Sequence, residues 1–348
     1  MLGSTAIISL TLLFSGVSYA SPDTLLPHGI DGTNGPQDLY KAAELSGNIE
    51  LVNEKREDNV ALRKVPNETP ELEALAADLP QYESFAVVGD SYSSGDGAFG
   101  GWGRGNCKRN KGSHGSRLNS VLKPTTFAYL PCSGAPVGNI LKKQVETKAF
   151  GTPDLVTMTA GGDNGGIFVK ILMACILHKS SKKCDKALKV GEATLLKLPS
   201  TLTPVYEAIM NKTGDDGVPP KVLHLGYVKM WARDTPKSEC PKHGTDVSWA
   251  SNGVGGYRDQ INELIVRINQ ATKEEADKHG VTFVDVDPYF EGHRLCDGQD
   301  ASWLQHRLTL RENGVLCHPT LDGHTAYMNA SLHALKGEKL VNGSFVPL

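Results

Sequence analysis

The sequence predicts an α/β domain, a three-layer α/β/α sandwich around a central parallel sheet of five strands. Two observations predict it. Five short, continuous apolar runs have the length and composition of strands that are buried on both faces. The segment between the last two runs has the apolar spacing of a helix that covers such a sheet.

The runs occupy, in chain order, residues 85–88, 127–130, 155–159, 222–225 and 281–286. Residues 257–279 carry apolar side chains at helical spacing, namely Ile261, Leu264, Ile265 and Ile268. Gly280 follows, at the position where glycine commonly ends a helix. Because strands that are separated by helices form parallel sheets, we expect residues 85–336 to fold as one α/β domain.

Composition narrows the class of protein. The 348-residue chain has a formal net charge of −3, which does not favour a nucleic-acid partner because that would need a clustered basic face. No internal repeat or low-complexity segment is present, which argues against a structural wall protein. The composition is therefore that of a soluble globular protein.

The N-terminus predicts export. Residues 1–20 are largely apolar and end in Ser18-Tyr19-Ala20, which is typical of a cleaved signal peptide, and no integral membrane segment is expected after cleavage. Seven cysteines fit an oxidising compartment, so we expect a secreted, extracellular protein. Four glycosylation triplets fit a eukaryotic secretory route, at Asn67, Asn211, Asn329 and Asn342.

Residues 21–82 differ from the rest of the chain. They are rich in proline and acidic residues and contain no cysteine or tryptophan. We interpret them as an N-terminal extension or propeptide that precedes a domain of residues 83–348. The pair Lys55-Arg56 is either a processing site or part of a solvated charged run.

Polar motifs follow several of the predicted strands. Chemistry in open α/β sheets gathers at the carboxyl ends of the strands, which makes these positions informative. They read Gly89-Asp90-Ser91 after the first strand, Cys132-Ser133-Gly134 after the second, Gly161-Gly162-Asp163-Asn164 after the third and Cys317-His318-Pro319 near the C-terminus.

In this order the motifs resemble the SGNH (GDSL-type) hydrolases, and in particular their secreted, disulfide-bonded esterases and lipases. The resemblance covers residues 84–336 and includes FAVVGDSYSSGDGA at 85–98 and FEGHRLCD at 290–297. It implies a flavodoxin-like fold and a serine esterase that acts on lipid, acyl or acetylated-sugar esters without a cofactor.

The resemblance implies that Ser91 is the nucleophile and His318 its base. A serine hydroxyl needs a positioned base to remove its proton, and histidine is suited to that role. His324 is the competing histidine, although its place in the motif is more often structural. The implied oxyanion hole contains the backbone amides of Ser91 and Gly134.

The third block departs from the pattern of the family. The family usually has Gly-x-Asn-Asp, whereas this chain has Asp163 followed by Asn164. By position Asp163 replaces the asparagine of the oxyanion hole, and by chemistry Asn164 is the better donor. An ionised Asp163 would repel the oxyanion, so it serves only if burial keeps it protonated. We expect Asn164 to be the donor, with Asp163 as the alternative.

The acid of a catalytic triad is also missing. Many members carry Asp three residues before the histidine, where this chain has Val315. We expect the main-chain carbonyl of Val315 to orient His318, as in some secreted members. A carboxylate that folds back is the alternative, from Glu312, Asp297, Asp300 or Asp322.

The resemblance further implies three disulfides, Cys107–Cys132, Cys175–Cys184 and Cys240–Cys296, and leaves Cys317 as a free thiol. No Cys-x-x-Cys or His-x-x-x-His spacing occurs, so we predict no metal. The competing hypothesis for the whole chain is a catalytically inactive secreted binding protein on the same scaffold. Only the order of Asp163 and Asn164 and the missing acid favour it.

Overall fold

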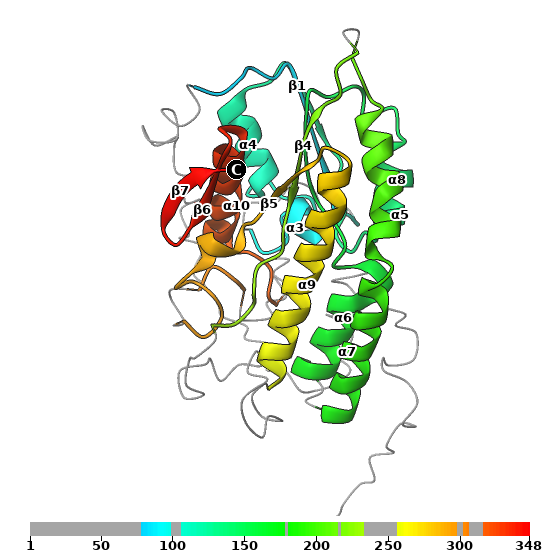
Figure 1. Ribbon diagram of the computed structural model, residues 1–348, viewed down its shortest axis with the longest axis vertical. Coiled ribbons are helices and arrows are strands. Elements are labelled where there is room, and N and C mark those ends of the chain that lie inside the picture. The colour runs from blue at the N-terminus through cyan, green and yellow to red at the C-terminus, as the bar shows by residue number, and fades with distance from the viewer. Residues whose placement is uncertain are drawn as a thin grey trace, which may run out of the picture.

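A parallel sheet of five strands is the central layer of the molecule (Figure 1). The structure is a computed structural model that describes residues 78–98, 106–177, 180–214, 217–232, 256–297, 302–305 and 316–348. The strands are β1 (Ser84–Gly89), β2 (Thr126–Tyr129), β3 (Leu155–Thr159), β4 (Lys221–Leu225) and β5 (Thr282–Val284). All five predicted strands are therefore present.

The sheet is doubly wound. Its strand order is β2-β1-β3-β4-β5, so the chain moves to one side of β1 and then returns to build outward on the other. The direction of winding reverses between β1 and β3, which pair in parallel with Gly89 opposite Thr159. Ligands of such sheets bind beyond the carboxyl ends of the strands at this reversal. The turn that carries Ser91 leaves the sheet at this point.

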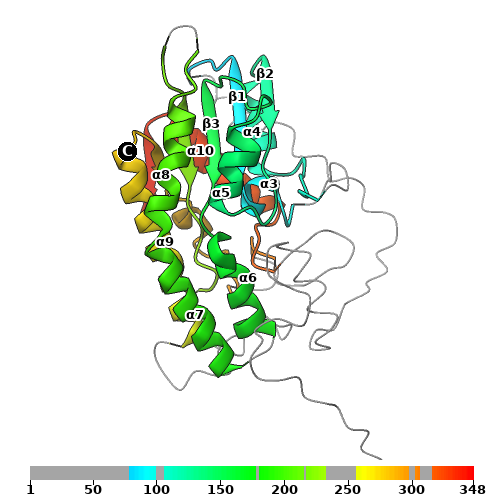
Figure 2. The same ribbon diagram turned by 90° about the vertical axis from the view of Figure 1, so that its right-hand side faces the viewer.

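Helices cover both faces of the sheet, as predicted. On one face lie α4 (His114–Leu122) and α10 (Leu321–Leu335), which pack on each other. On the other face lie α5 (Val137–Ile140), α8 (Leu198–Met210) and α9 (Tyr257–Lys278). Helices α6 (Ile167–Ile171) and α7 (Ser181–Leu195) extend past the end of the strands (Figure 2).

Shorter helical segments join these elements. Helix α3 (Ser91–Ser94) follows β1 directly. Single turns of 3-10 helix occupy Asn164–Gly166 and Asp287–Phe290, and π-helical turns occupy Leu141–Val145 and Leu172–Leu177. The turn at Asn164–Gly166 begins at the carboxyl edge of β3 and so belongs to the neighbourhood of Ser91.

Burial explains why the apolar runs became strands. Phe85, Ala86, Val87 and Val88 of β1 are each at most 1% exposed, because β1 has a strand on either side and helices above and below. The predicted stripe of α9, from Ile261 to Ile268, is buried in the same core. Gly280 follows α9 with a φ of 69°, the left-handed conformation that glycine adopts without strain.

A C-terminal hairpin was not predicted. Strands β6 (Glu338–Val341) and β7 (Ser344–Pro347) pair antiparallel and pack on α10. Their two-residue turn is Asn342-Gly343, with φ angles of 48° and 76°, the left-handed pair that such a turn requires.

The expected signal peptide and most of the extension, residues 1–77, lie outside the described residues. None of the helices that the structure describes combines the length and apolar character of a bilayer-spanning segment.

Candidate active site

The turn after β1 presents Ser91. Gly89 ends the strand with a φ of 129°, and a Cβ there would lie 2.5 Å from the carbonyl oxygen of Thr159 on β3. Only glycine fits so close to a neighbouring strand. Asp90 then caps α3, since its Oδ1 accepts a hydrogen bond from the amide of Tyr92 at 3.1 Å. Ser91 is thereby fixed as the first residue of a short helix at the edge of the sheet.

Ser91 and His318 are in contact. The Oγ of Ser91 lies 2.7 Å from Nε2 of His318, and the two residues are only 6% and 8% exposed. The Nδ1 of His318 lies 3.2 Å from the carbonyl oxygen of Leu316. Because a carbonyl only accepts, Nδ1 carries the proton and Nε2 is left to accept from the hydroxyl. This is the tautomer that a general base requires.

A carbonyl that sequence reasoning did not name, that of Leu316, lies at Nδ1, and Val315 as the orienting residue stays a prediction. Val315, the expected source, lies outside the described residues, as do Asp300 and Glu312. Asp297 accepts a hydrogen bond from the amide of Arg294 at 2.9 Å. Among the residues that the structure describes, the carbonyl of Leu316 holds the position at Nδ1.

Residues far away in sequence hold the segment around His318. Cys317 has a φ of 67°, an uncommon conformation for a residue with a side chain. Its carbonyl accepts from the hydroxyl of Tyr92 at 2.7 Å, and its amide donates to the carbonyl of Gln305 at 2.8 Å. The Tyr92 ring also packs on the imidazole, with centroids 5.1 Å apart. Tyr92 therefore ties the turn of the nucleophile to the segment of the base.

Two backbone amides in this region, one of them that of Ser91, have no acceptor among the described residues. Neither Ser91 N nor Gly134 N donates a hydrogen bond to another described residue. Gly134 adopts a φ of 76° in the loop after β2. Unpaired amides beside a nucleophile are the donors that an oxyanion hole needs.

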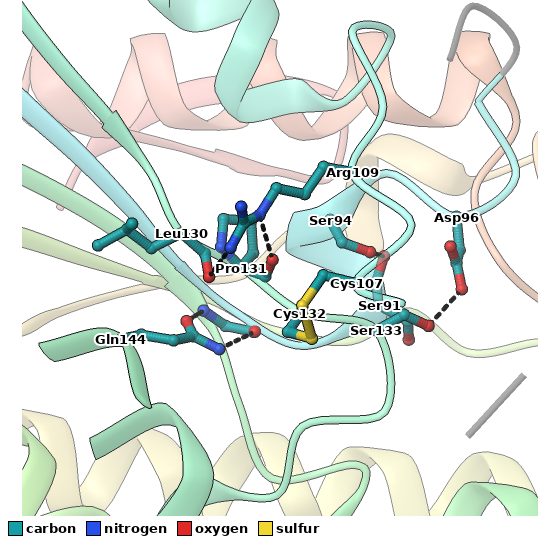
Figure 3. Close-up of a disulfide and its surroundings, with 11 residues drawn as sticks. Ser91, Ser94, Asp96, Cys107, Arg109, Leu130, Pro131, Cys132, Ser133 and Gln144 are labelled. Carbon is teal, nitrogen blue, oxygen red and sulfur yellow. Dashed lines mark hydrogen bonds between the residues drawn. A yellow bond between two sulfur atoms is a disulfide. The ribbon is translucent and has the colours of Figure 1, made fainter. Parts of the chain in front are cut away.

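The disulfide Cys107–Cys132 anchors the loop of Gly134 (Figure 3). The amide of Ser133 donates to the carbonyl of Cys107 at 3.1 Å, and its hydroxyl donates to Asp96 Oδ2 at 2.7 Å. The second of these bonds, drawn in Figure 3, links the loop to the segment that follows the nucleophile. A cavity of about 290 Å³ adjoins Gly134 and is lined in part by Arg109 and Lys143.

Asn164 and Asp163 have different surroundings. The Oδ1 of Asn164 accepts from the amide of Val137 at 2.9 Å, and its Nδ2 donates to the hydroxyl of Thr201 at 3.1 Å. The side chain of Asn164 thus joins α5 to α8. The half-buried carboxyl group of Asp163 has no hydrogen bond or ion pair with any described residue.

Three carboxyl groups lie on the turns near the nucleophile, and those of Asp90 and Asp96 are buried. Asp90 accepts from Thr159 Oγ1 at 2.6 Å and from the hydroxyl of Tyr227. Burial raises the pKa of Asp90 to about 6, although these bonds oppose the rise. Burial likewise raises the pKa of Asp96 to about 7 against the attraction of Lys108 and the bond from Ser133. Burial, and then repulsion by Asp90 and Asp96, raises the pKa of Asp163 well above its usual range.

The other histidines lie elsewhere. His324 is buried in α10 and stacks on His114 with centroids 5.8 Å apart. Burial, reinforced by the charge of His114, holds the pKa of His324 well below its usual range. His224 bonds to the hydroxyl of Tyr206 at 2.6 Å inside the core, and His293 stacks on Trp303 at 3.6 Å. His318, not His324, is the histidine that meets Ser91.

Two of the three disulfides that the resemblance implies are present, Cys107–Cys132 and Cys175–Cys184. Cys296 is disulfide-bonded as well, while Cys240, its expected partner, lies outside the described residues. Cys317 is a buried free thiol, and burial raises its pKa far above the ordinary value. Such a thiol stays protonated and is a poor nucleophile.

A doubly wound parallel sheet that presents a paired serine and histidine at its carboxyl edge has the arrangement of the α/β ester hydrolases. The family model for the GDSL-like lipase/acylhydrolases matches residues 87–326. This chain belongs to that family, and it is a carboxylic ester hydrolase.

Named relatives agree with this assignment. The chain is 32% identical to Lipase 1 of Streptomyces coelicolor over 255 residues, which cover 72% of this chain and 86% of that protein. It is 34% identical to a lipase of Streptomyces rimosus over 256 residues, with the same coverage of 72% and 86%.

Solved structures share the fold. The extracellular lipase of Streptomyces rimosus superimposes with a TM-score of 0.58 and 31% identity, and the match covers 71% of this chain and 97% of the lipase. Phospholipase A1 of Streptomyces albidoflavus superimposes with a TM-score of 0.60 and 27% identity, covering 72% of this chain and 98% of that enzyme.

Proposed function

We propose that this chain is a secreted serine esterase that cleaves carboxylic esters through an acyl-enzyme on Ser91. The observation that carries the proposal is the 2.7 Å contact between Ser91 Oγ and His318 Nε2, with the other ring nitrogen directed at a carbonyl. A hydroxyl in contact with a base of fixed tautomer is activated for attack on a carbonyl carbon.

The reaction has two steps. In the first, Ser91 Oγ attacks the ester carbonyl while His318 takes the hydroxyl proton, and collapse of the tetrahedral species passes this proton to the leaving alcohol. In the second, His318 removes a proton from water, the resulting hydroxide attacks the acyl-enzyme, and the acid leaves as Ser91 regains its proton. The amides of Ser91 and Gly134 stabilise the negative oxygen in both steps.

The carbonyl of Leu316 holds the imidazole in position throughout. It offers the imidazolium less charge stabilisation than a carboxylate would, so the pair acts as a dyad with a main-chain orienter. No metal or cofactor enters either step.

The substrate class follows from the relatives. Proteins named lipase and phospholipase A1 cover about 70% of this chain, so we propose lipid or short acyl esters as substrates, with acetylated sugars as the alternative.

The N-terminal organisation remains part of this proposal. We propose residues 1–20 as a signal peptide, 21–82 as an extension or propeptide and 83–348 as the hydrolase domain. The start of β1 at Ser84 and of the family match at residue 87 support the last boundary. The name of the extracellular relative supports export.

Glycan attachment is proposed only at exposed asparagines. Asn211 and Asn342 are exposed, and Asn67 lies outside the described residues. Asn329 was also expected to carry a glycan, but it lies half-buried within α10 and its Oδ1 is buried. We therefore propose glycans at Asn211 and Asn342, while Asn67 and Asn329 stay predictions.

The test is hydrolysis of p-nitrophenyl acetate by the wild type and by Ser91→Ala, followed by a panel of acetylated sugars, short acyl esters and phospholipids. Loss of the nucleophile should lower kcat by about 10⁴-fold or more, because the remaining site can only bind and polarise the ester. A fluorophosphonate should add its mass to Ser91 of the wild type and leave the variant unlabelled. Wild-type protein that folds but hydrolyses none of the panel would instead indicate the inactive binding protein.

A further inference from the structure

Asp96 lies between the turn of the nucleophile and the loop of Gly134, and the proposed reaction gives it no role. It is 1% exposed. Its amide donates to the carbonyl of Ser91 at 3.1 Å, and its own carbonyl accepts from Nε2 of His324 at 3.4 Å. The main chain of Asp96 is therefore joined to the nucleophile on one side and to α10 on the other.

The carboxyl group of Asp96 meets both ends of the Cys107–Cys132 disulfide. Its Oδ2 accepts from the hydroxyl of Ser133 at 2.7 Å (Figure 3), and Ser133 follows Cys132 in the chain. The charge of Lys108, which follows Cys107, attracts the same carboxyl group. One side chain therefore engages the residue after each cysteine, and the disulfide ties these residues together.

Residues 132–135 form a tight turn that carries the amide of Gly134. The amide of Ala135 donates to the carbonyl of Cys132 at 3.1 Å, and Gly134 has a φ of 76°, as the third residue of a type II turn does. The turn type sets the direction of the Gly134 amide within the loop. It does not set the distance of this amide from Ser91.

Two hydrogen bonds join this turn to the chain around Ser91, one on each side of the nucleophile. The amide of Cys132 donates to the carbonyl of Gly89, just before the nucleophile, at 3.0 Å. The hydroxyl of Ser133 donates to Asp96, which follows it. Among the described residues, loss of the second bond leaves the turn joined to this chain at Cys132 alone. The turn can then pivot, and the amide that it carries moves relative to Ser91.

Stability does not explain an aspartate at this position. The Oδ1 of Asp96 is buried and has no hydrogen-bond partner among the residues that the structure describes. Burial also raises the pKa of the carboxyl group to about 7, so the ionised form is disfavoured in the folded protein. A buried oxygen without a partner lowers the stability of a fold. The bond to Ser133 is therefore the feature of Asp96 that calls for a function.

We propose that Asp96 is a positioning residue for the oxyanion hole. Its bond with Ser133 holds the amide of Gly134 at a fixed distance from that of Ser91. The inference rests on the proposed esterase function, in which these two amides bind the negative oxygen. Asp96 itself touches neither the substrate nor the reacting atoms. It exchanges no proton, so its effect depends on the hydrogen bond and not on its charge.

The experiment compares the wild type with Asp96→Ala and Asp96→Asn, with p-nitrophenyl acetate as the substrate. Asp96→Ala removes the acceptor, so kcat should fall about 10–10²-fold with KM unchanged, because a misplaced donor affects the transition state more than the bound ester. Asp96→Asn keeps an acceptor oxygen for the hydroxyl and cannot ionise, so its kcat should stay within about threefold of the wild type.

A trifluoromethyl ketone tests the oxyanion hole directly. Ser91 Oγ adds to its carbonyl carbon while His318 takes the hydroxyl proton, and the ketone oxygen becomes a bound negative oxygen. The inhibition constant should rise in Asp96→Ala by the factor by which kcat falls, and should keep the wild-type value in Asp96→Asn. A change in folding stability alone would not alter this constant for the folded protein.

Ser133→Ala removes the donor of the same bond and should match Asp96→Ala, and it carries the test if Asp96→Ala does not fold. The double variant should lose no more kcat than either single variant, because both changes break one bond. Asp185→Ala is the control. Its carboxylate accepts from the hydroxyl of Tyr257 at 2.7 Å between α7 and α9, so this variant should keep the wild-type kcat.

Three results would overturn the inference in the Asp96 variants: wild-type kcat in Asp96→Ala, wild-type affinity of Asp96→Ala for the ketone, or an equal loss of kcat in Asp96→Asn. A double variant whose loss is the product of the two single losses would overturn it as well. A failure of the esterase proposal looks different, because the wild type itself would then hydrolyse no ester.

Discussion

The nucleophile and the base of this site are held in different ways. The turn from Gly89 to Asp96 contains several bonds among its own residues, such as Ser94 N to the Asp90 carbonyl at 2.8 Å, in addition to bonds from remote residues such as Tyr227 and Ser133. The segment from Leu316 to Thr320 is held by partners that are remote in sequence, since its bonds reach Tyr92, Trp303 and Gln305. The turn of Ser91 can be recognised from a short sequence motif because many of its bonds are local. The position of His318 depends on contacts across the whole fold.

The largest effect is expected at Gly89, where the turn before Ser91 has no space for a side chain. Gly89→Ala would place a methyl group 2.5 Å from the Thr159 carbonyl and 2.7 Å from Ser93 Oγ, at a φ of 129°. We expect a loss of about 3 kcal/mol or more in the free energy of unfolding, measured by urea titration.

Gly138→Ala is the matched control for this change. Gly138 lies in α5 with no atom within 4 Å of an added Cβ. Replacing a helical glycine with alanine should be neutral or stabilise by about 0.4–1 kcal/mol. Equal stability of the two variants would contradict the view that the turn of Ser91 requires glycine.

The second prediction removes the hydrogen bond that joins the turn of Ser91 to the segment of His318. Tyr92→Phe keeps the ring on His318 and removes the hydroxyl that donates to the Cys317 carbonyl at 2.7 Å. The segment of His318 then loses a hydrogen bond next to the histidine. We expect kcat to fall about tenfold with KM unchanged, because the change disturbs the alignment of His318 with Ser91 and not the binding of substrate.

Tyr206→Phe tests whether this effect is one of stability alone. Its hydroxyl bonds to His224 at 2.6 Å in the core, away from Ser91. Both variants should lose about 1 kcal/mol of stability, but only Tyr92→Phe should lower kcat. If kcat of Tyr92→Phe stayed at the wild-type value, Tyr92 would not be a positioning residue. The same conclusion would follow if Tyr206→Phe lost as much kcat.

The same contrast explains what sequence could predict. The strands and α9 follow from local apolar patterns, and the motif around Ser91 is one continuous stretch. The resemblance paired it with His318, and the structure brings the two together. The carbonyl of Leu316 was not found, because which of several consecutive carbonyls faces Nδ1 depends on backbone angles such as the φ of 67° at Cys317.

Other features were missed for two distinct reasons. The hairpin of β6 and β7 has a local signal in Asn342-Gly343, a pair that commonly forms the two-residue turn of a hairpin. The engagement of Asn164 by Val137 and Thr201 has no such signal, because its partners lie on two other helices. Asn164 as an oxyanion donor stays a prediction, because its Nδ2 donates one of two N–H groups to Thr201.

The smallest effect is expected at Cys317, whose backbone matters more than its side chain. Its carbonyl and amide hold the base segment, while the thiol is buried and free. Cys317→Ala leaves both backbone bonds in place, so kcat/KM should stay within about twofold, with a loss of about 1 kcal/mol in stability for the deleted sulfur. Because burial raises the pKa of the thiol, N-ethylmaleimide should not inactivate the native enzyme. A tenfold loss of activity in Cys317→Ala, or rapid inactivation that this variant escapes, would show that the side chain contributes to the site and that the base segment is not held by its backbone alone.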